Sequence, residues 1–353
     1  AAGFCSAGAG ADGRSGNAGA GCGGAGMSKT ATSVHLRLPA TSANLGPAFD
    51  TGALALKMHL EIDAEAADRF SIAAQGRDTE ACGKLEGNLV LETYKRLMQE
   101  NGRPIQPLQL RVNNGIPLGM GCGSSAAARL AGIALAVEFG ELGWPEQKIL
   151  DASAFLEGHP DNATACWLGG MTVSAIAPRA ATEHGEKTKG YPSVAVGRIE
   201  IPEHWSAVMV LPRDPVRTEE SRKLLPDFYS RADVVQNLQH SSLLVAAFAS
   251  GRDDLLRAAM LDCLHQPYRV AICPLLGTML PLAGTPGILG AALSGAGPGI
   301  LMVVERGLDR ADLERRVSKA LGDGSSCEVM ECGFESQGAG STVRRDTPLN
   351  AGA

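Results

Sequence analysis

The chain has 353 residues, of which 44% are hydrophobic and 20% are charged, and its formal net charge is -6 at pH 7. This length is enough for two lobes that each bury an apolar core. The acidic balance argues against a general nucleic-acid-binding protein, which would normally carry a basic excess, so we expect no nucleic-acid partner. No apolar stretch approaches the roughly 20 residues that span a bilayer, so we expect no membrane association. The nine cysteines include no C-x-x-C pair, which favours reduced, buried thiols in a cytoplasmic protein.

The first segment, residues 1–27, consists almost entirely of Gly, Ala and Ser and ends at Met27. It has too little apolar bulk to offset its chain entropy, so we predict a disordered extension outside the native fold. It has neither the apolar core of a secretory signal nor the arginines of a typical transit peptide. A plastid-targeting role is therefore the less favoured interpretation of this segment.

The N-terminal half of the remaining chain predicts a mixture of strands and helices. Alternating residues predict strands at 34–38 and 58–63, with a polar loop at 39–50 between them. Helical spacing and turn residues then predict, in chain order, a helix at 87–102, a strand that begins at 107 and turns at 113–115, helices at 124–139 and 145–158, and a loop, a short helix and a strand within 159–176. A polar surface connection is expected at 180–192.

The C-terminal half predicts a similar mixture. A buried strand is expected at 206–212, followed by a helix at 218–226 that is capped at its first residue. Residues 231–259 and 308–321 have helical spacing, and 288–305 predicts two strands joined by a glycine turn. Because strands and helices are mixed without a strict βαβ alternation, the expected fold class is α+β rather than a doubly wound parallel sheet.

The segment PLGMGCGSSAA, residues 117–127, places glycines and two hydroxyl side chains at the predicted start of a helix. Glycines let backbone N–H groups approach an anion closely, and the helix directs the positive end of its dipole toward that anion. Ser124 and Ser125 add hydroxyls that can bond a phosphate oxygen or a magnesium ion. The chain contains neither a G-x-x-x-x-G-K-[ST] loop nor a G-x-G-x-x-G fingerprint at this segment. On this segment alone, a tight strand-to-helix turn without a ligand is equally open.

Two other segments offer groups for a site. EGHPDN, residues 157–162, gathers two carboxylates, a histidine and an asparagine, and a carboxylate such as Glu157 can hold Mg²⁺ beside phosphate oxygens. The alternative is a solvated junction between a helix and a loop. SGAGPG, residues 294–299, is a glycine turn between apolar strands, and a tight hairpin explains it as well as a ligand contact does.

Together these motifs resemble those of the GHMP kinases. That family carries a P-x-x-x-N-[LI]-G-x-G-x-D segment, a P-x-x-x-G-[LA]-G-S-S-A loop and a late S-G-x-G-P turn. Here they stand in the same order as PATSANLGPAFD (39–50), PLGMGCGSSAA (117–127) and SGAGPG (294–299). Within the family, EGHPDNATACWLGG, HQPYR (265–269) and VLPRDPVRTEESRKLLP (210–226) resemble the homoserine kinases most closely.

The resemblance implies a two-lobed α+β fold, with a ribosomal protein S5 domain 2-like N-terminal lobe and a ferredoxin-like C-terminal lobe. The implied organisation is an ATP-binding lobe at 28–190, a C-terminal lobe at 191–340 and a flexible tail at 341–353. It also implies a homodimer.

For the acceptor, the resemblance implies L-homoserine held at its amino and hydroxyl end by Asn44 and Asp50, with Asn162 nearby. Arg222 and Arg269 would clamp its carboxylate, because a planar guanidinium suits bidentate binding of oxygens. The implied substrate-binding set is Asn44, Asp50, Asn162, Thr218, Arg222, Arg269 and Gly295. The implied catalytic set is Glu157, Asn162 and Asp50.

For ATP and magnesium, the resemblance implies that Ser125 and Glu157 hold Mg²⁺ and that Asn88 lies beside the adenine. The residues that would wrap the phosphates are Pro117, Leu118, Gly119, Met120, Gly121, Cys122, Gly123, Ser124, Ser125, Ala126 and Ala127. Three residues depart from the family pattern: Cys122 replaces Leu, Ala48 replaces Gly, and Thr51 stands where Ser is common. A Cβ at position 48 fits only if the φ angle there is negative.

The implied reaction moves the γ-phosphoryl group of ATP to the hydroxyl of L-homoserine, on the path to threonine. Such transfer depends mainly on in-line positioning and charge neutralisation. With Asn162 at the acceptor we expect no strong base, and Asp161 and Asp50 are the candidates to assist. The alternatives are another GHMP kinase acting on mevalonate or a shikimate-like acid, and a binding module without chemistry. Retention of Glu157 and both serines argues against the module, and an NAD(P) oxidoreductase ranks last because its βαβ pattern is missing.

Overall fold

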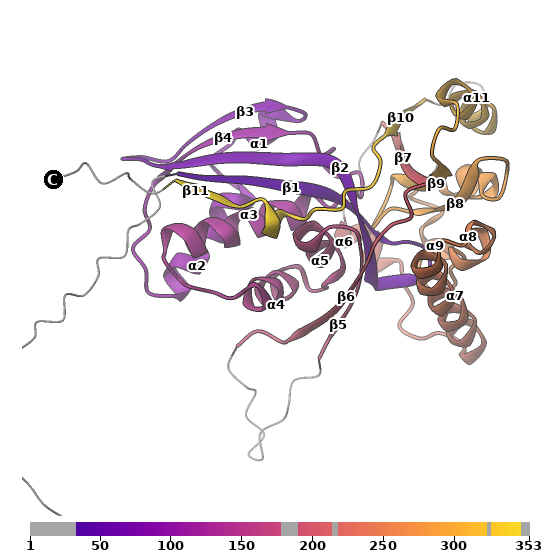
Figure 1. The fold of residues 1–353 in the computed structure, drawn as a ribbon, viewed down its shortest axis with the longest axis horizontal. Coiled ribbons are helices and arrows are strands. Elements are labelled where there is room, and N and C mark those ends of the chain that lie inside the picture. The colour runs from indigo at the N-terminus through magenta and orange to yellow at the C-terminus, as the bar shows by residue number, and fades with distance from the viewer. Residues whose placement is uncertain (1–32, 178–189, 214–217, 323–325, 347–353) are drawn as a thin grey trace, which may run out of the picture.

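The computed structural model describes residues 33–177, 190–213, 218–322 and 326–346, without the side chains of 218–220 and 346. Two sheets form within these residues, and they lie at opposite ends of the molecule (Figure 1). The predicted extension at 1–27 and most of the connection predicted at 180–192 lie outside the described residues.

The larger sheet has seven strands in the order β11-β1-β2-β4-β3, with β5 paired to β2 and β6 paired to β5. These strands are β1 (Ser33–Asn44), β2 (Ala48–Ala66), β3 (Ser71–Gly76), β4 (Leu108–Asn114), β5 (Met171–Ile176), β6 (Val194–Ile199) and β11 (Arg344–Asp346). All of the pairs are antiparallel except β3 with β4. Strand β4 alternates strictly between buried and exposed residues, as expected of a sheet with one covered face.

The first two strands are longer than the sequence predicts. The polar loop expected at 39–50 is wrong for most of its length, because β1 continues to Asn44 and β2 begins at Ala48. The two strands pair up to this point, with Asn44 opposite Ala48, which leaves residues 45–47 as the turn. Ladder hydrogen bonds here outweigh the loop-like composition of the segment, because the buried backbone groups need partners.

Four helices cover one face of the larger sheet (Figure 1). They are α2 (Leu89–Glu100), α3 (Ser124–Phe139), α4 (Glu146–Glu157) and α5 (Asp161–Leu168), and a short α1 (Thr79–Cys82) follows β3. These helices confirm the four predicted at 87–102, 124–139, 145–158 and within 159–176. Eleven of the 16 residues of α3 are buried, and its many alanines let it lie close to β1, β2 and the helices on either side of it.

The smaller sheet is antiparallel in the order β10-β7-β9-β8. Its strands are β7 (Trp205–Pro212), β8 (Ile288–Leu293), β9 (Ile300–Glu305) and β10 (Cys327–Glu331), and its helical segments are α6 (Thr218–Lys223), α7 (Arg231–Ser250), α8 (Asp253–Ala259), α9 (Gln266–Arg269), α10 (Leu276–Met279), η1 (Leu280–Leu282) and α11 (Arg310–Leu321). The strands predicted at 206–212 and within 288–305 are confirmed, as is the helix at 308–321. The helical region predicted at 231–259 is two helices, because Gly251, with φ +64°, ends α7.

The chain returns to the larger sheet after it has formed the smaller one, and an apolar cluster joins the two lobes. Strand β6 lies within the predicted C-terminal lobe (191–340) but pairs in the larger sheet, and the chain returns to that sheet through η2 (Ala339–Ser341) and β11. Residues 344–346 are therefore a strand, where the sequence predicted a flexible tail at 341–353. One apolar cluster contains Leu38 of the larger sheet together with Trp205 and Leu301 of the smaller one. The expected two-lobed α+β fold is confirmed.

Candidate active site

The glycine loop predicted to cradle phosphates leads into the N-terminus of α3. Gly123 precedes the helix with φ +68°, and a Cβ added there would lie 1.9 Å from the Thr41 hydroxyl. Gly121 has φ +77°, and its added Cβ would lie 2.1 Å from the carbonyl oxygen of Ser294. Both positions therefore need glycine for conformation and for space. Because no side chain caps α3, its first N–H groups are available to an anion.

The glycine turn at 294–299 lies against this loop and ties the smaller sheet to it. The Ser294 hydroxyl donates to the Gly121 carbonyl oxygen at 2.7 Å and lies 2.8 Å from the Ser42 hydroxyl. The Gly295 N–H donates to the Ala43 carbonyl oxygen at 3.0 Å. Three segments far apart in sequence, the end of β1, the glycine loop and this turn, thus meet at one place.

Two of the predicted metal ligands face each other at the start of α3. The Ser125 hydroxyl donates to Glu157 Oε1 at 3.0 Å, and Arg129 Nε lies 2.5 Å from the same oxygen. The Glu157 side chain is only 9% exposed, yet it ends beside the loop that would hold phosphates. One carboxylate and one hydroxyl suit Mg²⁺, which takes few protein oxygens and fills its shell with water and phosphate oxygens. These residues therefore fit the implied ion.

A small apolar cavity of about 60 Å³ lies next to Ser124. It is lined by Leu60, Cys82, Asn88, Val90, Leu110, Val112, Asn114, Ile116, Leu118 and Ser124. Asn88 caps α2, because its Oδ1 accepts from the Leu91 N–H at 3.2 Å and its Nδ2 donates to the Cys82 carbonyl oxygen at 3.2 Å. Both ends of its amide are thus already hydrogen-bonded, and Asn88 lines this cavity with its position fixed.

The predicted acceptor residues also come together. Arg222 of α6 makes a two-pronged ion pair with Asp50 of β2, with Nη2 and Nη1 2.6 and 3.0 Å from the carboxylate oxygens. Hydrogen bonding to Asp50 raises the pKa of Arg222. Arg269 lies 1% exposed and donates to the Gly295 carbonyl oxygen at 3.2 Å. Both guanidinium groups lie near the Phe49 ring, at 5.4 and 5.5 Å from its centre.

Arg269 is the buried cation of this pocket, whereas Arg222 is partly exposed and already paired with Asp50. Burial and the nearby Arg222 lower the pKa of Arg269, so the protein itself does not fully compensate that charge. His265 stays neutral, because burial lowers its pKa to about 4. It donates from Nε2 to the Gly46 carbonyl oxygen at 2.7 Å and accepts from Arg269 at Nδ1. An anion bound beside Arg269 would supply the missing charge.

Asn44 connects this pocket to the glycine turn. Its Nδ2 donates to the Gly295 carbonyl oxygen at 2.9 Å, and its Oδ1 accepts from the Asp50 N–H at 3.0 Å. Ala48, the predicted departure from the family pattern, is not among the residues with positive φ, so its Cβ is accommodated. Cys122 is buried in the loop, and burial raises its pKa to about 12, which makes it a packing residue.

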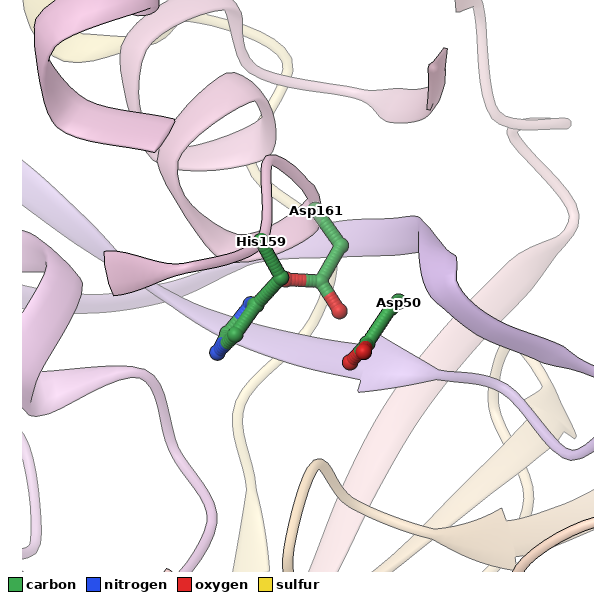
Figure 2. Close-up of side chains that lie close together, drawn as sticks. All are labelled: Asp50, His159 and Asp161. Atoms are coloured by element: carbon green, nitrogen blue, oxygen red, sulfur yellow. The ribbon is translucent and has the colours of Figure 1, made fainter. Parts of the chain in front are cut away.

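A second polar group lies between the arginine pocket and the glycine loop. Figure 2 shows His159 and Asp161, at the start of α5, and Asp50 directed toward the same space. Asp161 Oδ1 accepts from His159 Nδ1 at 2.5 Å and from the Asn162 N–H at 2.6 Å. Asn162 Oδ1 in turn accepts from the Thr41 hydroxyl at 2.6 Å.

These three residues make a poor metal site. Asp50 is already paired with Arg222, and Asp161 accepts hydrogen bonds from its neighbours. Burial alone would lower the pKa of His159, but the hydrogen bond to Asp161 and the charges of Asp161 and Asp50 outweigh it, so this pKa is raised. A raised pKa favours the protonated ring, which cannot bind a metal.

Contacts thus link many of the predicted site residues in two groups: Asn44 and Arg269 both bond the Gly295 carbonyl oxygen of the glycine turn, and Ser125 bonds Glu157 at the start of α3. Thr218 begins α6, but its side chain lies outside the described residues. Sequence reasoning missed the contacts of Thr41, His265 and Arg129. Thr41 and His265 lie inside segments that the motifs had already marked, whereas nothing in the sequence distinguished Arg129.

All seven cysteines that the structure describes are free, and four of them are buried. In the described part of the chain, every helix is too short or too polar to cross a lipid bilayer.

Comparison with known proteins gives the family. The GHMP kinases N terminal domain matches residues 88–170, and the GHMP kinases C terminal domain matches residues 244–323. A homoserine kinase from Solibacter usitatus is 41% identical over 85% of this chain and 96% of its own length. One from Desulfitobacterium hafniense is 35% identical over 87% and 99%. The crystal structure of homoserine kinase from Cytophaga hutchinsonii has the same fold, with a TM-score of 0.70 at 22% identity over 89% of this chain and 98% of that one. The chain belongs to the GHMP kinase family and, within it, to the homoserine kinases.

Proposed function

We propose that this chain transfers the γ-phosphoryl group of ATP to the hydroxyl of L-homoserine, with Mg²⁺ as cofactor. The observation that carries the proposal is that two groups of residues with different chemistry lie next to each other. A pocket with two guanidinium groups, Arg222 and Arg269, lies beside the N-terminus of α3, and Thr41 and Asn162 bridge the two. Such a pocket selects an acceptor that carries a carboxylate.

On the nucleotide side, the triphosphate would lie along the glycine loop with the adenine in the apolar cavity beside Asn88. The N–H groups at the start of α3 would bond phosphate oxygens. Ser125 and Glu157 would hold the metal ion, which supplies neutralisation of phosphate charge when it is bound. Arg129 would keep the Glu157 carboxylate directed toward Ser125.

On the acceptor side, the substrate carboxylate would lie between Arg222 and Arg269, and Asp50 and Asn44 would bind its amino and hydroxyl end. Asn162 would lie at the reacting hydroxyl, and its amide is no base. The hydroxyl proton would therefore pass to a phosphate oxygen during transfer, since a loose transition state makes little demand on a base. Positioning of the hydroxyl in line with the γ-phosphate would supply most of the acceleration.

The test is ADP release with L-homoserine compared with mevalonate, shikimate, L-serine and galactose. We expect kcat/KM for L-homoserine to be highest by at least about tenfold. Faster turnover on mevalonate or shikimate would make the chain a GHMP kinase of another small acid, which is the second candidate. The paired arginines favour a carboxylate in both cases, so only this panel separates them.

We further propose that the protein is a homodimer that associates through the outer face of α6 to α9. Eight of the exposed large apolar side chains lie in this region: Leu224, Phe228, Val234, Val235, Leu238, Leu261, Tyr268 and Val270. From Val234 to Ser250, α7 contains no Asp, Glu, Lys or Arg, although much of it is exposed. Depletion of charge is typical of the core of homodimer interfaces. Leu238→Glu should give a monomer by light scattering, while Leu85→Glu, at another exposed leucine outside this region, should not.

A further inference from the structure

Asn237 is a buried polar residue of α7 that no sequence motif singles out. It is 5% exposed, and both ends of its amide bond to backbone. Its Nδ2 donates to the Pro47 carbonyl oxygen at 2.8 Å, and its Oδ1 accepts from the Cys263 N–H at 3.2 Å. One side chain thus joins α7 to the turn between β1 and β2 and to the segment that leads into α9.

That turn has an unfavourable backbone. Asn44, Leu45 and Gly46 have φ angles of +72°, +48° and +86°, and Asp50 follows with +53°. Non-glycine residues in this region are strained, and such strain persists only where the surroundings hold the backbone in place. Two of the carbonyl oxygens of the turn are held by side chains from the smaller lobe. Gly46 is bonded by His265, and Pro47 is bonded by Asn237.

The same turn carries the residues that face the acceptor. Asn44 stands at its start and Asp50 just beyond its end, and the hydrogen bond between them depends on the path of the backbone from 44 to 50. The ion pair of Asp50 with Arg222 depends on it too. The glycine loop and the cavity beside Asn88 are formed by other segments, and Asn237 has no hydrogen bond to either.

We infer that Asn237 is a positioning residue for the acceptor, an inference that rests on the proposed function of this site. Its amide N–H fixes the Pro47 carbonyl and with it the placement of Asn44 and Asp50. Loss of that donor leaves a buried carbonyl without its partner, and the strained turn then relaxes. The cost falls on binding of the acceptor and leaves the nucleotide side intact.

Asn237→Asp is the informative variant, because a carboxylate still accepts from the Cys263 N–H but cannot donate to Pro47. We expect the KM for L-homoserine to rise about tenfold to hundredfold, the range that corresponds to one lost buried hydrogen bond. The KM for ATP should change by less than about twofold. Asn237→Ala, which removes both bonds without adding charge, should show the same split and decides the question if the aspartate variant does not fold.

Asn101→Asp is the matched control. Asn101 also donates from Nδ2 to a backbone carbonyl oxygen, that of Leu97 at 2.8 Å, at the end of α2, and its change should leave both KM values unaltered. Turnover of the unaltered enzyme on L-homoserine tests the proposed function, whereas the ratio of variant to unaltered enzyme, measured on whichever acceptor is turned over fastest, tests this inference. Equal rises in both KM values, or an unchanged acceptor KM in a folded variant, would overturn it.

Discussion

At the scale of single residues, the two acidic side chains of the EGHPDN segment have different surroundings and should have different roles. Glu157 ends beside Ser125 at the phosphate loop, whereas Asp161 is 1% exposed and occupied by hydrogen bonds within its own segment. We expect Glu157→Gln to lower kcat by roughly two to three orders of magnitude, as is typical when a group that stabilises transition-state charge is removed. Asp161→Asn should lower it by about tenfold or less, since a neutral amide oxygen still accepts hydrogen bonds.

Coupled ADP release measures both variants. Glu138→Gln is the control. Like Glu157, Glu138 is a carboxylate with little exposure that pairs with an arginine, here Arg345. It lies near the C-terminal end of α3, away from the site. Its kcat should stay within about twofold of the unaltered enzyme. Similar losses for the variants at 157 and 161 would show that this division of roles is wrong.

His159 should make stability depend on pH. Its pKa is raised above 6.5, because the hydrogen bond and charge of Asp161 and the charge of Asp50 outweigh the effect of burial. A group whose pKa is higher in the folded state stabilises the fold fully below the unfolded value and loses that effect as pH rises through the folded value. The difference in unfolding free energy between the unaltered protein and His159→Gln should therefore shrink as pH rises from 6 to 8. Urea denaturation at several pH values measures it, and a difference that grows with pH would contradict the assignment.

The sequence predicts the site residues that lie within recognisable motifs, but not those whose role depends on a partner far along the chain. Asn44, Asp50 and Glu157 could be found because residue type and motif spacing point to them directly. Asn237 could not, because a single asparagine in a helix is ordinary and its partner, Pro47, is 190 residues away. Arg129 was missed for a similar reason, since its role appears only when α3 and α4 lie side by side.

At the scale of elements, the junction between the glycine loop and α3 should tolerate no side chain. Gly123→Ala combines a positive φ with a Cβ placed 1.9 Å from the Thr41 hydroxyl. Gly143→Ala has the same backbone penalty, with φ +60°, but no atom within 4 Å of its added Cβ. We expect both to lose about 1 kcal/mol of stability from the backbone. Only Gly123→Ala should also raise the KM for ATP, by roughly tenfold or more, because the helix N-terminus must shift.

Thermal melts and ATP kinetics on the two alanine variants separate these effects. If Gly143→Ala raised the KM for ATP as strongly, the weaker ATP binding would come from general destabilisation, and the junction between the glycine loop and α3 would have no special role.

The elements predicted correctly are those with strong local patterns. Helices α2, α3 and α4 and strands β7 to β9 have apolar periodicity or long buried runs, and the sequence predicts them. Strands β3, β6, β10 and β11 were not predicted, because they lie at sheet edges or have short, half-exposed patterns and form only against partners far along the chain. The loop predicted at 39–50 failed for a different reason, because β1 and β2 are consecutive strands that stay paired as far as Asn44 and Ala48, and this pairing overrode the turn-like composition.

At the scale of the whole molecule, the two lobes should unfold as one unit. A single apolar cluster includes Leu38 and Tyr94 of the larger lobe with Trp205, Phe248 and Leu301 of the smaller one. Strand β11 also returns the chain to the larger sheet after the last strand of the smaller sheet, β10. Neither lobe can therefore unfold without exposing apolar surface of the other, which makes partly folded states costly.

We expect calorimetry to show one transition, with equal calorimetric and van't Hoff enthalpies, and expect far-UV circular dichroism and tryptophan fluorescence to melt together. The three tryptophans make this comparison informative, because Trp205 lies in the smaller sheet while Trp144 and Trp167 lie in the larger lobe. Because dimer formation would raise the melting temperature with concentration, the measurement is made at several protein concentrations and on Leu238→Glu as well. Two separate transitions in the monomeric variant would show that the shared core does not couple the lobes, and that each folds on its own.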